Sequence, residues 1–230
     1  MIDSNVATIF LVDDQEETRT RHERVLREAG FNVATFANAA QFLEVYNPGA
    51  AGCIVCEFKL PDMGALELLR VLQAKELEPT FMVLTRHDDV SNAVRSLKAG
   101  AFDFLEKPVE TEVLTNQVQL ALQEDAKRRR ARRVRTEISD RHVRLTRRER
   151  EVMKLMVSGK ASKEIASYLE LSPRTVESHR ARIMRKMEAN SLPELVRYSM
   201  LMQSTCCSQI LKALHEVEPN TVTSLQPVLV

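Results

Sequence analysis

The first 110 residues alternate short apolar runs with segments of helical hydrophobic spacing. The segments between the runs place apolar residues three or four positions apart, as in Leu66, Leu69 and Leu72. Regular alternation of strand and helix predicts a parallel sheet covered by helices on both faces. We therefore expect an α/β domain of the flavodoxin-like (βα)5 type, with its site beyond the carboxyl ends of the strands. The apolar runs are TIFLV (8–12), NVATF (32–36), CIVC (53–56), FMVL (81–84) and FDFL (102–105).

A long helical segment follows these runs. It begins near Glu110, keeps apolar spacing through Leu122 and then becomes basic at KRRRARRVR (127–135), without Gly or Pro before Arg144. A continuous helix would make this stretch a semi-rigid connector, whereas fraying would make it a charged, flexible linker. The sequence leaves both interpretations open.

From Leu145 onward the pattern is entirely helical, and each expected helix has a capping signal at its start. Four short helices predict a compact all-α module that ends near Met202. Beyond it we expect a weak helix around 210–214 and a tail without assigned chemistry. The start signals are, in chain order, Thr146 with Glu149, Ser162, Ser172 with Pro173, and Ser191 with Glu194.

The net charge of +1 hides an asymmetry between the two halves of the chain. Residues 1–126 contain 11 Lys and Arg against 21 Asp and Glu, which gives a net charge of −10. Residues 127–230 contain 22 basic and 11 acidic residues, which gives a net charge of +11. Such a division of charge suggests an acidic domain joined to a basic domain that binds a polyanion. Charge alone is equally compatible with two solvated faces.

The four cysteines favour a reduced protein over a metal site. Cys53 and Cys56 lie in one apolar run, where a spacing of three residues points them to opposite faces of a strand. The chain has no second pair at zinc spacing, so we expect these two residues to be buried free thiols. No stretch is apolar enough to span a membrane, and the first ten residues do not form a secretory signal. We expect a cytoplasmic protein.

Acidic side chains lie at the predicted strand ends. Asp13 and Asp14 follow the first strand, and Glu57 follows the third. Three carboxylates side by side repel one another unless a cation lies among them, and Mg²⁺ suits such an all-oxygen site. Thr85 ends the fourth strand and Lys107 follows the fifth, where a hydroxyl and an ammonium can contact a phosphoryl oxygen. Each residue alone is compatible with a solvated loop group. Together they predict a pocket that binds Mg²⁺ and holds a phosphoryl group.

Several motifs together resemble one protein family. The chain carries VDD at 12–14, KLPDM at 59–63, VLTRHDD at 83–89 and KAGAFDFLEKP at 98–108, besides the helical module. In combination they resemble the response regulators of two-component systems, most of all the FixJ branch of the NarL/LuxR-type class. The resemblance spans about residues 6–202. It implies a receiver domain over 1–124, a basic helical linker over 125–142, a LuxR/FixJ-type helix-turn-helix DNA-binding domain over 143–203 and a C-terminal tail over 204–230.

One position departs from the family pattern. The resemblance places the phosphoacceptor Asp at Glu57, with the register fixed by the FKLPDM that follows. Glu is one methylene longer, about 1.5 Å, and a misplacement of about 1 Å can slow phosphoryl transfer about a hundredfold. We hypothesise that Glu57 imitates a phosphorylated Asp and makes the receiver partly or wholly independent of phosphorylation. Alternatively, Glu57 only disables the switch, is an engineered residue, or accepts phosphate poorly, and Asp62 in the next loop is a further candidate acceptor.

The helix predicted over 173–187 has an apolar stripe opposite a polar face that suits the DNA major groove. The stripe contains Val176, Ile183 and Met187, and the opposite face carries short polar side chains and arginines that can contact base edges. A solvated basic helix is the alternative interpretation. The segment LTRREREVMKLMVSGKASKEIASYLELSPRTVESHRARIMRKM resembles the DNA-binding domain of the same family. That resemblance implies base-facing positions at Glu177, Ser178 and Ala181, and phosphate contacts from Lys163, Arg174, Thr175, Arg182 and Lys186.

The resemblance also implies partners. We expect double-stranded promoter DNA and a homodimer, because helix-turn-helix modules bind paired half-sites, with a histidine kinase and RNA polymerase as candidate partners and no membrane. In the family, the fourth helix (192–202) pairs with its copy, and the receiver face around 88–108 forms a second contact. An interaction protein without DNA binding is the competing class, whereas nothing in the sequence indicates an enzyme. Candidates for the dimer contact, and equally for the domain core, are Leu192, Leu195, Val196 and Leu201.

Overall fold

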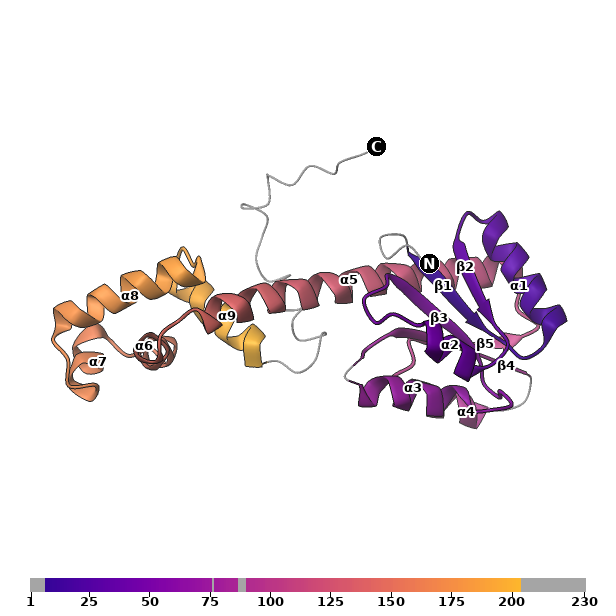
Figure 1. Ribbon diagram of the computed structural model, residues 1–230, viewed down its shortest axis with the longest axis horizontal. Helices are drawn as coiled ribbons and strands as arrows, with labels where there is room; N and C mark the ends of the chain where they lie inside the picture. Colours follow the sequence, from indigo (N-terminus) through magenta and orange to yellow (C-terminus); the bar gives the residue numbers. More distant parts are fainter. Residues whose placement is uncertain (1–6, 76, 87–89, 204–230) are drawn as a thin grey trace. The chain divides into compact units, whose positions relative to one another are not determined.

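The structure is a computed structural model that describes residues 7–75, 77–86 and 90–203 (Figure 1). Contacts between residues divide the chain into two compact units, 1–129 and 130–230. Among the residues described, no helix combines the length and apolar character that crossing a bilayer requires. The predicted tail, with its weak helix around 210–214, lies outside the described residues, as do Cys206 and Cys207.

The N-terminal unit is built on a five-stranded parallel sheet with the strand order β2-β1-β3-β4-β5. This order defines the flavodoxin-like, doubly wound fold and confirms the predicted fold class. Each strand overlaps one of the five apolar runs of the sequence, with identical bounds for β1 and β2 and bounds that differ by one or two residues for β3, β4 and β5. The strands are β1 (Thr8–Val12), β2 (Asn32–Phe36), β3 (Gly52–Glu57), β4 (Thr80–Arg86) and β5 (Asp103–Lys107), and the helices are α1 (Glu16–Glu28), α2 (Ala39–Val45), α3 (Ala65–Ala74), α4 (Val90–Lys98) and α5 (Thr111–Val143).

The sheet separates two hydrophobic cores. Leu26 of α1 and Leu114 of α5 pack on one face, and Phe42 of α2 packs on the other with the buried leucines of α3. Cys53 belongs to the first core and Cys56 to the second, which confirms that the two thiols point to opposite faces. Burial raises the pKa of both thiols, so they remain protonated packing groups.

Helix α5 continues without a break from Thr111 to Val143, so of the two interpretations the continuous helix is the observed one. Its first half packs Leu114 and Val118 against the sheet. From Arg130 onward it belongs to the C-terminal unit, where Ala131 and Ile138 are buried in the core. Much of the predicted linker (125–142) therefore contributes to the packing of the C-terminal unit.

The C-terminal unit adds four short helices to the end of α5. Thr146 and Glu149 form the predicted capping box, with bonds of 2.8 Å from the Thr146 N–H to the Glu149 carboxylate and 3.3 Å from the Glu149 N–H to the Thr146 hydroxyl. Ser172 accepts from the Thr175 N–H, and Pro173 occupies the first turn, as predicted. The helices are α6 (Arg147–Val157), α7 (Ser162–Tyr168), α8 (Pro173–Met187) and α9 (Leu192–Gln203).

Two predicted caps differ in detail. Ser162 is the first helical residue of α7 and not its cap, because the helix begins after Ala161, whose N–H donates to the Glu164 carboxylate at 2.8 Å. At α9, the Ser191 hydroxyl accepts from the Glu194 N–H at 3.3 Å, as predicted. The Glu194 carboxylate, however, accepts from the N–H of Asn190 at 2.8 Å, one residue before Ser191. Acidic side chains three residues into a helix thus cap it even where the expected hydroxyl is missing.

Glu170, in the turn between α7 and α8, has a φ of 55°, in the left-handed region that favours glycine. Because its side chain is exposed, we expect Glu170→Gly to raise the free energy of unfolding of the C-terminal unit by about 0.5–1 kcal/mol. Urea unfolding measures this gain. The matched control Glu177→Gly, inside α8, should lower the same quantity by about 1 kcal/mol. An equal loss in both variants would contradict a strained turn.

Candidate functional site

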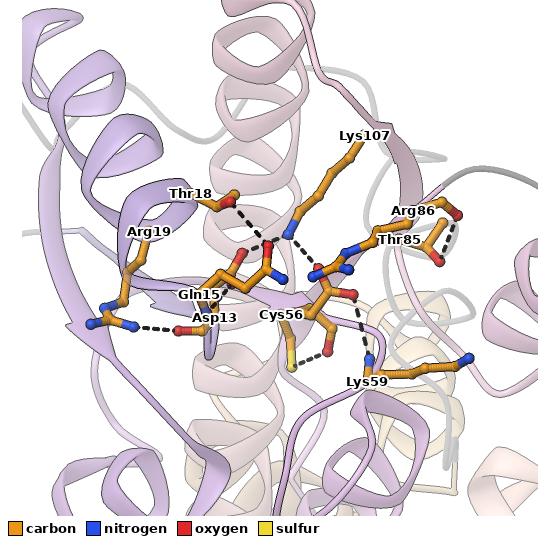
Figure 2. Close-up of polar contacts among 10 residues, drawn as sticks. Asp13, Gln15, Thr18, Arg19, Cys56, Lys59, Thr85, Arg86 and Lys107 are labelled. Atoms are coloured by element: carbon orange, nitrogen blue, oxygen red, sulfur yellow. Dashed lines mark hydrogen bonds and ion pairs between the residues drawn. The ribbon is translucent and has the colours of Figure 1, made fainter.

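Three predicted pocket residues come together at the carboxyl edge of the sheet. Asp13 follows β1, Glu57 ends β3 and Lys107 ends β5. The Lys107 ammonium lies 2.6 Å from Asp13 Oδ2 and also forms an ion pair with Glu57 Oε2. Figure 2 shows Lys107 reaching across to Asp13. The Lys107–Pro108 peptide bond that follows is cis.

Both carboxylates of this pocket are removed from water. Asp13 is 0% exposed and Glu57 is 5% exposed. Their remaining oxygens accept backbone N–H groups, from Gln15 to Asp13 Oδ1 at 2.9 Å and from Lys59 to Glu57 Oε1 at 3.5 Å. Two buried carboxylates are stable together only with a compensating cation and satisfied lone pairs. Lys107 supplies that cation.

The other two predicted pocket residues do not join this group. Asp14 is exposed, and the buried Thr85 hydroxyl donates to the carbonyl of Arg86 at 3.3 Å (Figure 2). Within the described part of the chain, no three acidic, histidine or cysteine side chains assemble at metal-binding geometry. The carboxylates offer the oxygen ligands that Mg²⁺ prefers, but in this arrangement Lys107 occupies the position between Asp13 and Glu57. The three predicted ligands therefore do not fit Mg²⁺ as they stand.

Helix α1 contributes pocket residues that the sequence analysis did not identify. Arg19 Nη1 donates to the Asp13 carbonyl at 2.7 Å, and the Thr18 hydroxyl donates to the Gln15 side chain at 3.3 Å (Figure 2). His22, one turn further along, is 5% exposed. Burial and the nearby Lys107 charge lower its pKa to about 4, so the imidazole is neutral at pH 7. In the sequence, the available signal for His22 was its position about one helical turn after Thr18 and Arg19.

Asp62 has a structural role in this arrangement. Its carboxylate accepts the backbone N–H groups of Ala39 at 3.2 Å and Ala40 at 2.8 Å, at the first turn of α2. Burial acts to raise the pKa of Asp62, but these backbone hydrogen bonds outweigh it and hold the pKa below its ordinary value. The side chain that was a further candidate acceptor thus caps a helix.

Helix α8 has the two faces that the sequence predicts. Val176, Ile183 and Met187 are buried in the core of the C-terminal unit, which confirms the apolar stripe. On α7, Lys163, a predicted phosphate contact, is exposed. The exposed residues of α8 include five of the predicted DNA contacts, Arg174, Glu177, Ser178, Ala181 and Arg182.

Two predicted phosphate contacts already have partners within the unit. The Lys186 ammonium lies 2.6 Å from the carboxylate of Glu149 and also donates to the Arg144 carbonyl at 3.3 Å. The Thr175 hydroxyl lies 2.8 Å from that of Ser172. Lys186 is thus placed to hold α8 against the start of α6 rather than to reach outward.

Helix α9 divides the residues predicted for a dimer contact. Leu195 and Leu201 are buried in the core of the C-terminal unit, and Leu192 packs against that core. Val196 is half-buried. The large apolar side chain that α9 exposes is Met200, at 60%. The sequence left a dimer contact and the domain core as interpretations of these residues. For Leu195 and Leu201, the core is the observed one.

Two family profiles match the chain. Residues 9–119 match the response regulator receiver domain, and residues 143–199 match the bacterial regulatory proteins of the luxR family. The transcriptional regulatory protein FixJ of Azorhizobium caulinodans is 40% identical over 193 residues, which cover 84% of this chain and 92% of that protein. The response regulator protein TodT of Pseudomonas putida is 33% identical over 192 residues, which cover 83% of this chain and 84% of TodT.

Solved structures give the same result. The response regulator StyR matches with a TM-score of 0.73 and 37% identity, over 85% of this chain and 98% of that one. Full-length FixJ from B. japonicum matches with a TM-score of 0.52 and 36% identity, over 86% of this chain and 97% of that one. Receiver domains bind Mg²⁺ in their acidic pocket and interact with kinases, and LuxR-type domains bind DNA. The chain therefore belongs to the FixJ-like response regulators of two-component systems, transcription factors that join a receiver domain to a LuxR-type DNA-binding domain.

Proposed function

We propose that this response regulator controls transcription with a receiver that acts partly or wholly without phosphorylation, because Glu57 imitates a phosphorylated Asp. The observation that carries the proposal is the ion pair between Glu57 and Lys107 in the unmodified chain. A phosphoryl group on an Asp at this position would present its negative charge to the same lysine. The extra methylene of Glu, about 1.5 Å, brings the carboxylate toward that place without any modification.

The same geometry disfavours phosphoryl transfer to Glu57. Its Oε2 is paired with Lys107, and its Oε1 accepts from the Lys59 N–H at 3.5 Å, so both oxygens are less nucleophilic toward a phosphodonor than those of a free carboxylate. Lys107 also provides positive charge between Asp13 and Glu57, where the family uses Mg²⁺. We therefore expect DNA binding to be unchanged when a chelator removes Mg²⁺. Mg²⁺ bound by Asp13, Asp14 and Glu57 would require Lys107 to move away.

The DNA-binding part of the proposal rests on the exposed face of α8. Glu177, Ser178 and Ala181 face the base edges in the major groove, where a carboxylate can accept from cytosine and a methyl group can contact thymine. A homodimer on promoter DNA, with RNA polymerase and a histidine kinase as further partners, completes the proposal, and a regulator of this kind acts in the cytoplasm. The exposed residues that contact phosphates are Lys163, Arg174 and Arg182.

The test compares DNA affinity and oligomeric state for the native chain, Glu57→Asp and Glu57→Gln, each with and without acetyl phosphate and Mg²⁺. We expect the native chain to bind equally well under both conditions. Glu57→Asp should lose DNA binding in the absence of the phosphodonor, because its shorter carboxylate no longer reaches Lys107. It should regain DNA binding with the phosphodonor, because an Asp at this position can accept a phosphoryl group. Glu57→Gln keeps the length of the side chain without its charge, so it should stay inactive under both conditions.

Three results would contradict the proposal. Stoichiometric, Mg²⁺-dependent phosphate on Glu57 that raises DNA affinity would make the protein a conventional phosphorylation-switched regulator. Full DNA binding by Glu57→Gln would show that the charge of Glu57 has no role in activation. Loss of all DNA binding at low salt would favour an interaction protein over a transcription factor.

A further inference from the structure

Two adjoining hollows lie on the receiver domain, along α3 and α4 and the loop before α3. Their volumes are about 260 Å³ and 510 Å³. They share Leu66, Arg70 and Arg95, so they form one groove, which we call the α3–α4 groove. Lys98 lines the first hollow and Lys59 the second. The volume of the second hollow suits a small ligand, since ligand sites are commonly about 300–1,000 Å³.

The groove is positively charged within an acidic domain. Arg70, Arg95, Lys98 and Lys59 are all exposed, whereas residues 1–126 together have a net charge of −10. Of the described residues that line the groove, Glu67 alone is acidic. Between residues 7 and 203, with the undescribed positions left aside, none of the four cations is paired with a carboxylate. Cations that neighbouring acids do not neutralise concentrate a positive potential, which attracts an anion.

The walls of the groove are held in place. The Gln73 side chain, on α3, donates to the Ala99 carbonyl, just after α4, at 2.9 Å and so ties the two helices together. Arg95 donates to the Asn92 side chain at 3.4 Å, and Asn92 is itself buried. A fixed separation between α3 and α4 reduces the ordering that a ligand would have to impose on Arg70 and Arg95.

The lining also contains an apolar surface. Phe58, Leu60 and Leu66 are half-buried, and the first two pack on the core beneath. Guanidinium groups bind phosphate oxygens through two parallel N–H bonds and stack on flat rings. Two arginines beside an apolar surface thus combine the recognition of a phosphate with that of an organic group.

We propose that the α3–α4 groove binds a nucleotide-sized organic phosphate, with Arg70 and Arg95 on the phosphate and Leu66 against the organic part. Lys98 and Lys59 extend the positive surface at the two ends of the groove. Such a ligand brings negative charge to a lining in which, among the residues that the structure describes, Glu67 alone is acidic.

The groove adjoins the loop that follows Glu57. Phe58 donates its N–H to the Leu84 carbonyl at 2.7 Å, and the Lys59 N–H points to Glu57 Oε1 at 3.5 Å. A ligand that engages Lys59 therefore acts on the backbone that holds Glu57 in place. The ligand is thereby an effector of a receiver that does not use phosphorylation, a role that rests on the proposed function. Linkage then requires DNA and ligand to change each other's affinity by the same factor.

The test uses the full chain, ATP and inorganic pyrophosphate as probes, and a buffer without divalent cations. Calorimetry should show saturable binding of one ATP per chain at millimolar concentration or below, with pyrophosphate weaker because it lacks the organic group. Amide shifts in an NMR titration should map to α3 and α4. The variant Arg70→Gln/Arg95→Gln should weaken ATP binding about tenfold or more, since each lost guanidinium removes charge-assisted hydrogen bonds. The matched control Arg21→Gln/Arg24→Gln, which removes two exposed arginines from α1, should leave the affinity unchanged.

The proposal fails if ATP does not saturate at millimolar concentration, or if its affinity survives Arg70→Gln/Arg95→Gln. It also fails if the groove binds an acidic peptide such as polyglutamate in preference to ATP, because the occupant would then be a protein. The titration needs neither DNA nor a phosphodonor. Phosphorylation of Glu57 would therefore overturn the proposed function and leave this result as it stands.

Discussion

Replacing Lys107 with methionine is expected to lower the free energy of unfolding of the receiver domain by about 3 kcal/mol. Methionine has a similar length but removes the ammonium that lies between Asp13 and Glu57. Both carboxylates are buried, so they would face each other without the cation that compensates them. Urea unfolding in the presence of a chelator measures this loss of stability. Hydrogen exchange of the β1 and β3 amides, used as the readout, restricts the measurement to this domain.

The double variant Glu57→Gln/Lys107→Met provides the control for the Lys107 prediction. It removes the second carboxylate together with the ammonium, so it should be more stable than Lys107→Met alone. If Lys107→Met unfolds at the same urea concentration as the native chain, the ion pairs do not stabilise the pocket. The structural basis of the proposed phosphate mimicry would then be lost.

Replacing Lys186 with methionine is expected to lower the free energy of unfolding of the C-terminal unit by about 2–3 kcal/mol. Glu149 is 2% exposed and loses its ion-pair partner, while the N–H of Thr146 is left to compensate the buried charge. Urea unfolding at pH 7 measures the loss. The control Lys154→Met, at an exposed position of α6, should change stability by less than about 0.5 kcal/mol.

The stabilisation by Lys186 should depend on pH in a defined direction. Burial acts to raise the pKa of Glu149, but the hydrogen bonds from Lys186 and Thr146 outweigh it and hold the pKa below its ordinary value of 4.5. A lowered carboxyl pKa contributes stability above pH 4.5, and this contribution is lost as the pH falls through the folded-state pKa. The difference between Lys186→Met and the native chain should therefore persist at pH 5–7 and shrink in stronger acid. If Lys186 contacts a phosphate instead, the substitution would lower the salt slope of DNA binding by about one.

The elements of the fold could be predicted from local patterns. Each apolar run became a strand, and the capping signals at Thr146 and Ser172 located the starts of α6 and α8. These features depend on residues close in sequence, which is why the sequence carries them. Ser162 shows the limit, because the competing cap from Glu164 lies two residues away and moves the start of α7.

The candidate site was predicted in part. Asp13, Glu57 and Lys107 end three different strands, and the parallel sheet brings those ends together. Sequence spacing does not say which of two neighbouring acids turns inward, so Asp14 was grouped with Asp13 although it is exposed. The family resemblance implied a phosphate contact for Lys186. Its partner Glu149 lies 37 positions earlier, a tertiary contact that the sequence alone does not reveal.

The carboxylate of Asp62 joins the loop that follows Glu57 to the start of α2. Consequently, the amide protons of Ala39 and Ala40 exchange with solvent only when that carboxylate withdraws or α2 opens. Two backbone positions far from Glu57 in sequence thus act as native reporters of the motion of its loop. Their exchange rates can be read in the wild-type chain, without any probe placed near the pocket.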